Sequence, residues 1–216
     1  MANANLLRTP AGEILIAPET SRPLSAALLR DIAREFPRFR VVSKHESRLC
    51  RAIHAALIVL TLGGQRRFLD GYYTVLFDTL YVPTTAWEAL DDIDRVILLR
   101  HERVHLRQRR RYGGLGMAFI YLVPIFPLGL AWGRARLEWE AYAETLRATA
   151  ELRGLPAAQS ATLRNKIIDR FVGPDYGWMW PFRSTIERWY RRVLEELASQ
   201  PGARLGSTPA SNPFQK

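Results

Sequence analysis

Residues 98–106 read Leu98-Leu99-Arg100-His101-Glu102-Arg103-Val104-His105-Leu106 and contain the pattern His-Glu-x-x-His. Residues four apart lie on the same face of an α-helix, so His101 and His105 can reach one ion. Two neutral imidazoles at this spacing suit Zn²⁺. Glu102 can then act as the general base on a water that the metal activates. The alternative interpretation is a buried helix with two hydrogen-bonded histidines.

The chain around this motif favours a helix. Acidic residues precede the motif and arginines follow it, which is the order that a helix dipole prefers, and Gly113 with Gly114 provides a stop. The two motif histidines share an apolar helical face with four other residues: Ile93, Ile97, Leu98 and Val104. We therefore expect both imidazoles to point toward a core or a cleft.

The composition of the chain limits its domain number, disulfide content, cellular location and binding partners. The chain has 216 residues, 48% of them hydrophobic, which predicts one domain over residues 1–198 followed by a disordered tail over 199–216. A single cysteine, Cys50, excludes an internal disulfide framework and fits a reducing compartment. The N-terminus lacks the pattern of a signal peptide, so we expect a cytoplasmic protein, with membrane association as an alternative. The net charge of +10 predicts attraction to nucleic acid or anionic lipid.

Hydrophobic patterning predicts an α+β fold that is mostly helical. Before the motif we expect a loop or short strand over 13–17, a helix over 23–36, strands over 39–42, 71–77 and 80–82, and a short helix from Thr85, besides the apolar stretch 49–62 described below. Further helices are expected over 136–154, 157–170 and 184–197. An edge strand should lie beside the motif helix, where a peptide could add to the sheet by backbone pairing.

Two apolar stretches need separate interpretation. Residues 49–62 number 14, too few for the roughly 20 that span a bilayer, and predict a buried core helix. Residues 114–132 carry no charge over 19 positions and are flanked by arginines, which is typical of a membrane segment. Pro124 and Pro127 would break a straight helix. A buried or re-entrant helical hairpin is therefore favoured, with membrane-surface docking as the alternative.

A third zinc ligand can be sought by elimination. No histidine follows His105, and the first acidic residue after it is Glu138, on a predicted helix. A catalytic zinc usually takes three protein ligands and leaves one position for water. Two antiparallel helices could bring His101, His105 and Glu138 to one ion. Glu140 is the other candidate, with Glu144 as its hydrogen-bonding partner, and lies about 200° away around the helix.

The motif followed by Glu138-Trp139-Glu140-Ala141 resembles the gluzincin group of zinc metallopeptidases. The resemblance implies a zincin-like domain that binds one zinc per chain through His101, His105 and Glu138. It also implies hydrolysis of a protein or peptide substrate, with Glu102 as the general base. Tyr142 stands where these families often have the Asp or Asn that orients a histidine. Tyr142 is also one candidate donor to the oxyanion, beside Tyr176 and the region around Arg183 and Arg188.

A second function class stays open at this point. The gluzincin scaffold could be catalytically silent and serve as a binding or regulatory module. Its contact with nucleic acid or an anionic membrane would use two basic runs: Arg107, Arg109, Arg110 and Arg111 in the first, and Arg188, Arg191 and Arg192 in the second.

Overall fold

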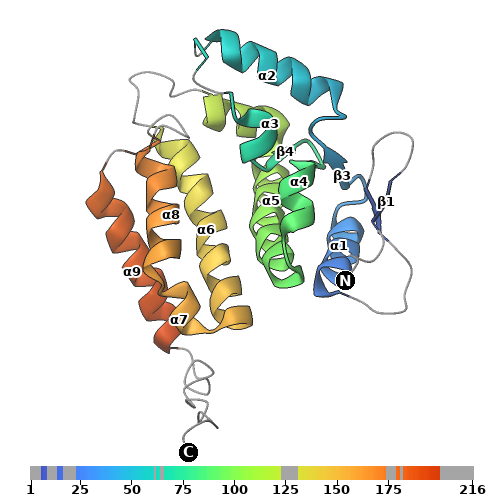
Figure 1. Cartoon of the computed structure of the whole chain (residues 1–216). Coiled ribbons are helices and arrows are strands. Elements are labelled where there is room, and N and C mark those ends of the chain that lie inside the picture. Colours follow the sequence, from blue (N-terminus) through green and yellow to red (C-terminus); the bar gives the residue numbers. More distant parts are fainter. Residues whose placement is uncertain are drawn as a thin grey trace, which may run out of the picture. The chain divides into compact units, whose positions relative to one another are not determined.

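Figure 1 shows the computed structural model of the chain, in which helices form most of the regular structure. The chain divides into two compact units, residues 1–122 and residues 123–216. The structure describes residues 6–8, 14–16, 23–60, 62–63, 66–122, 131–173, 179–180 and 182–199. The expected tail lies outside these residues apart from Ser199, and the single domain over 1–198 stays a prediction.

The first unit combines helices with two small sheets. In chain order its elements are β1 (Leu6–Arg8), β2 (Ile14–Ile16), α1 (Leu24–Glu35), β3 (Arg40–Ser43), α2 (Arg48–Leu60), α3 (Phe68–Gly71), β4 (Thr74–Leu76), β5 (Thr79–Val82), α4 (Thr84–Ala89) and α5 (Asp92–Leu122). β1 and β2 form an antiparallel pair. The predicted α+β, mostly helical fold is confirmed.

A three-stranded sheet with the order β3-β5-β4 lies in the first unit. β3 and β5 are parallel, with Val41 opposite Leu80. β5 and β4 are antiparallel, with Val75 opposite Leu80. β4 is thus an edge strand, and it contacts α5, the helix that carries the motif. The predicted edge strand beside the motif helix is confirmed.

The core of the first unit joins α1, the three-stranded sheet, α4 and α5. Its buried apolar side chains are Leu29, Ile32, Phe36, Val41, Leu80, Val82, Trp87, Leu99 and Leu106. Fully burying a large aliphatic side chain contributes about 1.5–3 kcal/mol. Leu99 and Leu106 flank the motif on α5, so their burial fixes the rotation of α5 about its own axis.

Polar contacts join α1 to α5 at both ends of α1. At the start of α1, the Asp92 carboxylate accepts hydrogen bonds from Leu24 N at 2.7 Å and from Ser25 N at 3.1 Å. At its end, Glu35 accepts from Arg103 Nε at 2.6 Å and from Arg107 Nε at 2.7 Å. Arg107, then Arg103, hold the pKa of the Glu35 carboxyl below its ordinary value against the opposing effect of burial. These contacts fix α5 on the first unit over most of the length of α1.

The prediction of a buried core helix over residues 49–62 is wrong. α2 forms there, but one side of it faces solvent, with Leu49 and Val59 among the exposed hydrophobic residues. α2 packs against α3, and the ring of His54 stacks on Phe68 with centroids 6.4 Å apart. The apolar sequence therefore forms a helix of about the expected length, but several of its apolar side chains are exposed instead of buried.

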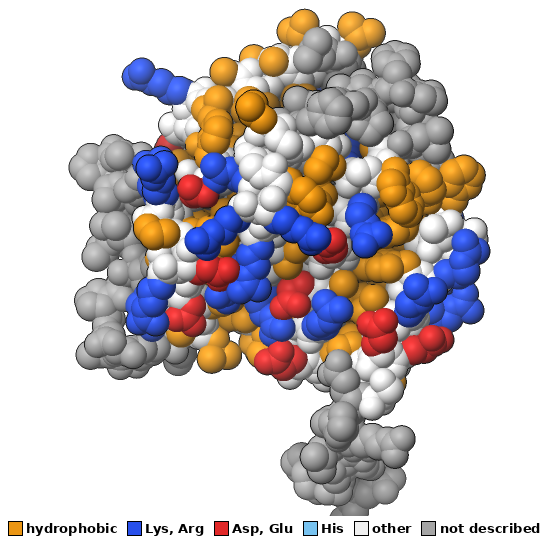
Figure 2. All heavy atoms as spheres, turned by 180° about the vertical axis from the view of Figure 1, so that it is seen from behind, with side chains coloured by type: hydrophobic (Ala, Val, Ile, Leu, Met, Phe, Trp, Pro, Cys, Tyr) orange, Lys and Arg blue, Asp and Glu red, His pale blue; other side chains and the backbone are white. Residues whose placement is uncertain are grey.

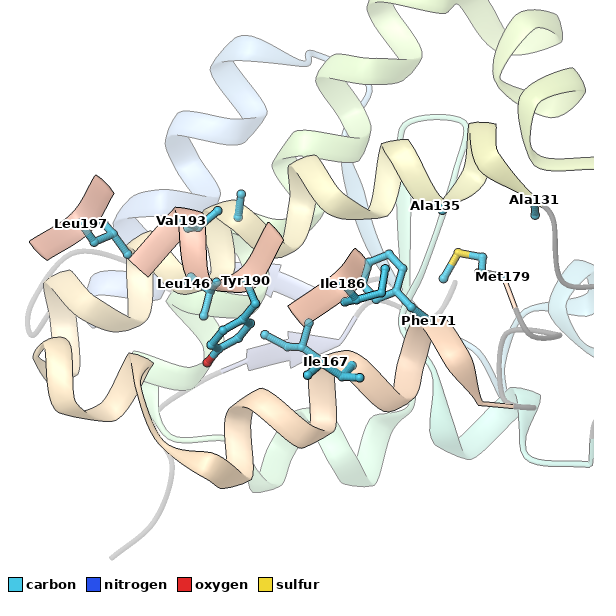
Figure 3. Close-up of a cluster of buried hydrophobic side chains, with 12 residues drawn as sticks. Ala131, Ala135, Leu146, Ile167, Phe171, Met179, Ile186, Tyr190, Val193 and Leu197 are labelled. Atoms are coloured by element: carbon cyan, nitrogen blue, oxygen red, sulfur yellow. The ribbon is translucent and has the colours of Figure 1, made fainter. Parts of the chain in front are cut away.

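The second unit consists of α6 (Trp132–Arg153), α7 (Leu155–Ala158), α8 (Ala161–Val172) and α9 (Arg183–Ser199) among its described residues. Figure 3 shows Ile167, Phe171, Ile186 and Tyr190 pointing toward one another in its buried cluster. The Tyr190 hydroxyl donates a hydrogen bond of 2.6 Å to the Ala158 carbonyl. The helices expected over 136–154, 157–170 and 184–197 correspond to α6, α8 and α9.

The long helix α5 is interrupted at Gly113, whose φ of 72° and ψ of 164° are not helical. This is the predicted stop, and glycine suits it because a positive φ strains other residues. The hairpin expected over 114–132 falls partly on residues 123–130, which lie outside the described residues. Within the part of the chain that is described, none of the helices has the length and hydropathy needed to cross a membrane.

Candidate metal centre

The motif helix begins with a polar cap and then presents the two histidines one turn apart. The Asp91 carboxylate accepts a hydrogen bond of 2.7 Å from Asp94 N, which satisfies one of the free amides in the first turn of α5. Asp92 and Asp94 add negative charge at the positive end of the helix dipole. Because the helix starts at Asp92, His101 and His105 both fall within its regular part, one turn apart.

The two imidazoles are neighbours in space, with ring centroids 5.0 Å apart and an interplanar angle of 77°. His105 is buried, and its Nδ1 lies 3.0 Å from Oε1 of Gln108, which is buried as well. An amide oxygen can only accept, so this contact requires the proton on Nδ1. In that tautomer Nε2 of His105 is unprotonated, which is the form that a metal ligand needs.

Glu102 is buried on α5 and interacts with two polar groups of the first unit. Lys44, fully buried at the end of β3, donates a hydrogen bond of 2.8 Å to the Phe68 carbonyl. Burial lowers the pKa of Lys44 to about 8, although Cys50, Glu102 and Asp70 act in the opposite direction. Burial, and then the charge of Glu102, raises the pKa of Tyr73 to about 12. Near neutral pH, Glu102 therefore has an ammonium group and a protonated phenol in its surroundings.

The second unit contributes the acidic candidates on α6. Glu138 is buried there. Glu140, two residues on, is more exposed, and its Oε1 lies 3.9 Å from Arg136 Nε. Tyr142 packs against Phe171, with ring centroids 5.6 Å apart. The opposite environments of Glu138 and Glu140 follow from their separation of about 200° around one helix.

The described residues include a group of side chains with the donor spacing of a metal site: His101, His105 and Glu138. Their possible ligand atoms all lie within 4.8 Å of one another. A tetrahedral zinc with bonds of about 2.1 Å holds its ligand atoms about 3.4 Å apart. Two imidazoles and a carboxylate are a set of donors that a catalytic zinc takes, so the chemistry of these side chains fits that metal.

Sequence reasoning missed three residues near the motif: Lys44, Tyr73 and Gln108. Gln108 could have been found, because a residue three positions after His105 lies on the same face of the helix. Lys44 directly follows β3 and Tyr73 directly precedes β4, both far from the motif in sequence, and neither has a local signal. Tyr176 lies outside the described residues. Arg183 pairs with Glu187 and Asp169 on the second unit, and Arg188 donates to the Thr185 hydroxyl at 3.3 Å.

Comparisons of the chain with models of protein families, with curated proteins and with solved structures found no match. The function must therefore be argued from the residues themselves.

Proposed function

We propose that this chain is a zinc-dependent metalloendopeptidase of the gluzincin type. The observation that supports the proposal is the group formed by His101, His105 and Glu138, whose possible ligand atoms lie within 4.8 Å of one another. Two features of α5 add to it. Glu102, next to His101 in the sequence, is buried, and the Gln108 contact favours the His105 tautomer whose Nε2 is unprotonated.

In the proposed reaction Glu102 is the general base. Its carboxylate takes a proton from the attacking water and later delivers a proton to the nitrogen of the leaving amine. When bound by the two histidines and Glu138, zinc would supply a Lewis acid that lowers the pKa of water and polarises the scissile carbonyl. Glu102 attracts the Lys44 ammonium electrostatically, so a positive charge accompanies the proposed base inside the first unit. Tyr142 is the proposed second donor to the oxyanion.

The edge strand β4 is the proposed binding element for the substrate backbone. One side of β4 pairs with β5, and β4 also contacts α5. An extended peptide could pair with the other side of β4 and lie beside the motif helix. Recognition through backbone groups fits an enzyme that acts within a polypeptide. The single buried cysteine, Cys50, fits the proposed cytoplasmic location.

The alternative, a catalytically silent module that binds polyanions, has weaker support. Arg107 of the first basic run is paired with Glu35, and Arg109 is paired with Asp78. Both arginines therefore join parts of the first unit. These ion pairs explain two of the four arginines in the run without any bound polyanion.

Zinc content and hydrolysis of an unfolded protein such as casein test the proposal together. We expect about one zinc per chain in the wild type and in Glu102→Gln. Glu102→Gln should hydrolyse casein about 10²–10⁴-fold more slowly. Glu138→Ala should lose both zinc and hydrolysis.

Glu140→Ala is the matched control, because it removes a carboxylate from the same helix. It should keep zinc and activity, and loss of zinc in this variant alone would place the third ligand at Glu140. A wild-type chain that takes up no zinc after reconstitution would overturn the proposal, as would wild-type hydrolysis by Glu102→Gln.

A further inference from the structure

Helix α2 carries a stripe of exposed apolar side chains. Leu49, Ala52, Ala56 and Val59 recur at helical spacing and are all exposed. Leu49 is 44% exposed and Val59 is 73% exposed, and Leu62, just past the end of the helix, is 96% exposed. Exposed apolar residues are ordinary when scattered, but an aligned set on one helix marks an interaction surface.

The charged side chains between Arg48 and Phe68 are all arginines, and the nearest acidic residues in the sequence, Glu46 and Asp70, lie just outside this range. Arg48 and Arg51 are exposed at the start of α2, and Arg66 and Arg67 are exposed after its end. No acidic residue occurs between Arg48 and Phe68. In Figure 2 orange apolar side chains lie along the upper edge, where Figure 1 shows α2. An apolar strip with arginines at both ends is complementary to a bilayer surface, which offers hydrocarbon beneath anionic headgroups.

The length of α2 decides how such a helix would meet a bilayer. Its 13 residues span about 20 Å, which is short of the roughly 30 Å hydrocarbon core. A short amphipathic helix of this kind lies in the plane of the interface with its apolar face down. The half-buried side of α2, which packs on α3, stays with the protein.

We propose that α2 is a membrane-docking helix, which places Leu49, Ala52, Ala56 and Val59 among the lipids of an anionic bilayer while the flanking arginines bind lipid headgroups. The proposal does not depend on the peptidase activity. It differs from the docking considered for residues 114–132, because it assigns the contact to a helix that the sequence predicted to be buried.

Sedimentation with lipid vesicles tests the proposal on the full chain. The wild type should bind vesicles of phosphatidylcholine mixed with phosphatidylserine, and should bind vesicles of phosphatidylcholine alone much more weakly. Val59→Glu should lower the partition coefficient roughly tenfold or more. The double variant Arg48→Gln with Arg51→Gln should lower it by roughly fivefold for each arginine removed.

Two matched variants separate α2 from general charge attraction. Phe77→Glu makes the same kind of change at an exposed apolar residue in the turn between β4 and β5. Arg191→Gln with Arg192→Gln removes two exposed charges from α9. Neither should alter vesicle binding by more than about twofold. Circular dichroism of each variant reports whether the fold is retained.

Three results would overturn the proposal. The first is a wild-type chain that does not bind mixed vesicles at low salt. The second is an equal loss of binding in the α2 variants and in their matched controls, which would assign the attraction to total charge. The third is a wild-type dimer in analytical ultracentrifugation that Val59→Glu dissociates while vesicle binding is unchanged, which would assign the stripe to a second copy of the chain.

Discussion

Gln108→Ala tests whether Gln108 orients His105 as a ligand of the proposed zinc. In the wild type, the Gln108 amide oxygen lies 3.0 Å from Nδ1 of His105, and both residues are buried. The alanine removes the acceptor that fixes the imidazole tautomer and the orientation of the ring. Loss of such a partner typically lowers metal affinity 10–100-fold, or by about 1.4–2.7 kcal/mol of binding free energy.

The assay is a zinc titration in competition with a chromogenic chelator, at a pH near neutral. Gln108→Glu is the control, because it keeps an oxygen acceptor at the same position and should hold zinc at least as tightly as the wild type. Urea unfolding of the metal-free proteins separates binding from stability, since an orphaned buried donor costs about 1–3 kcal/mol on its own. A folded Gln108→Ala variant with zinc affinity within about twofold of the wild type would refute the reasoning.

Three predictions concern the stability of the first unit. Asp92→Ala should lower the free energy of unfolding in urea by about 1–3 kcal/mol, whereas Asp31→Ala, which breaks an exposed pair with Arg34, should cost less than about 1 kcal/mol; equal losses would contradict the role of Asp92. Glu35 has a lowered pKa, so its contribution is present above its ordinary pKa of 4.5 and is lost as pH falls through the lower folded value. The free energy of unfolding of the wild type should therefore fall more in acid than that of Glu35→Gln. Equal falls in the two proteins would contradict the role of Glu35. Lys44 has a pKa lowered from 10.5 to about 8, so the unfolded chain binds its proton more tightly. Stability should rise between those pH values by up to about 3 kcal/mol, and Lys44→Met should flatten that rise in thermal melts; an unchanged slope would exclude Lys44 as its source.

Local patterns were sufficient for most of the secondary structure. The motif helix was predictable because its acidic start, its apolar face and the glycine at its end are all encoded within about 20 consecutive residues. The strands before it were predictable for a similar reason, because Thr74–Leu76 and Thr79–Val82 are rich in β-branched and aromatic residues. The histidine spacing then followed from the geometry of one helix.

Burial was harder to predict than secondary structure. Residues 49–62 have the composition of a core helix, but hydropathy does not state what covers each face of a helix. Lys44 shows the opposite case, since a lysine is expected at the surface but here is fully buried and donates to the Phe68 carbonyl. Both outcomes depend on packing between segments that are separate in sequence.

The net charge of the chain does not by itself show which arginines can contact a partner, because some of them form ion pairs within the fold. Read as a run, Arg107 to Arg111 resembles a site for a polyanion. In the structure Arg107 pairs with Glu35 and Arg109 pairs with Asp78, so these charges help to fix α5 within the first unit. The arginines that flank α2 are exposed and border apolar side chains that also face solvent. Arginines that are paired within a unit stabilise the fold, whereas exposed arginines beside an exposed apolar stripe can bind a partner. For this reason the membrane contact is proposed for α2 and not for the run from Arg107 to Arg111.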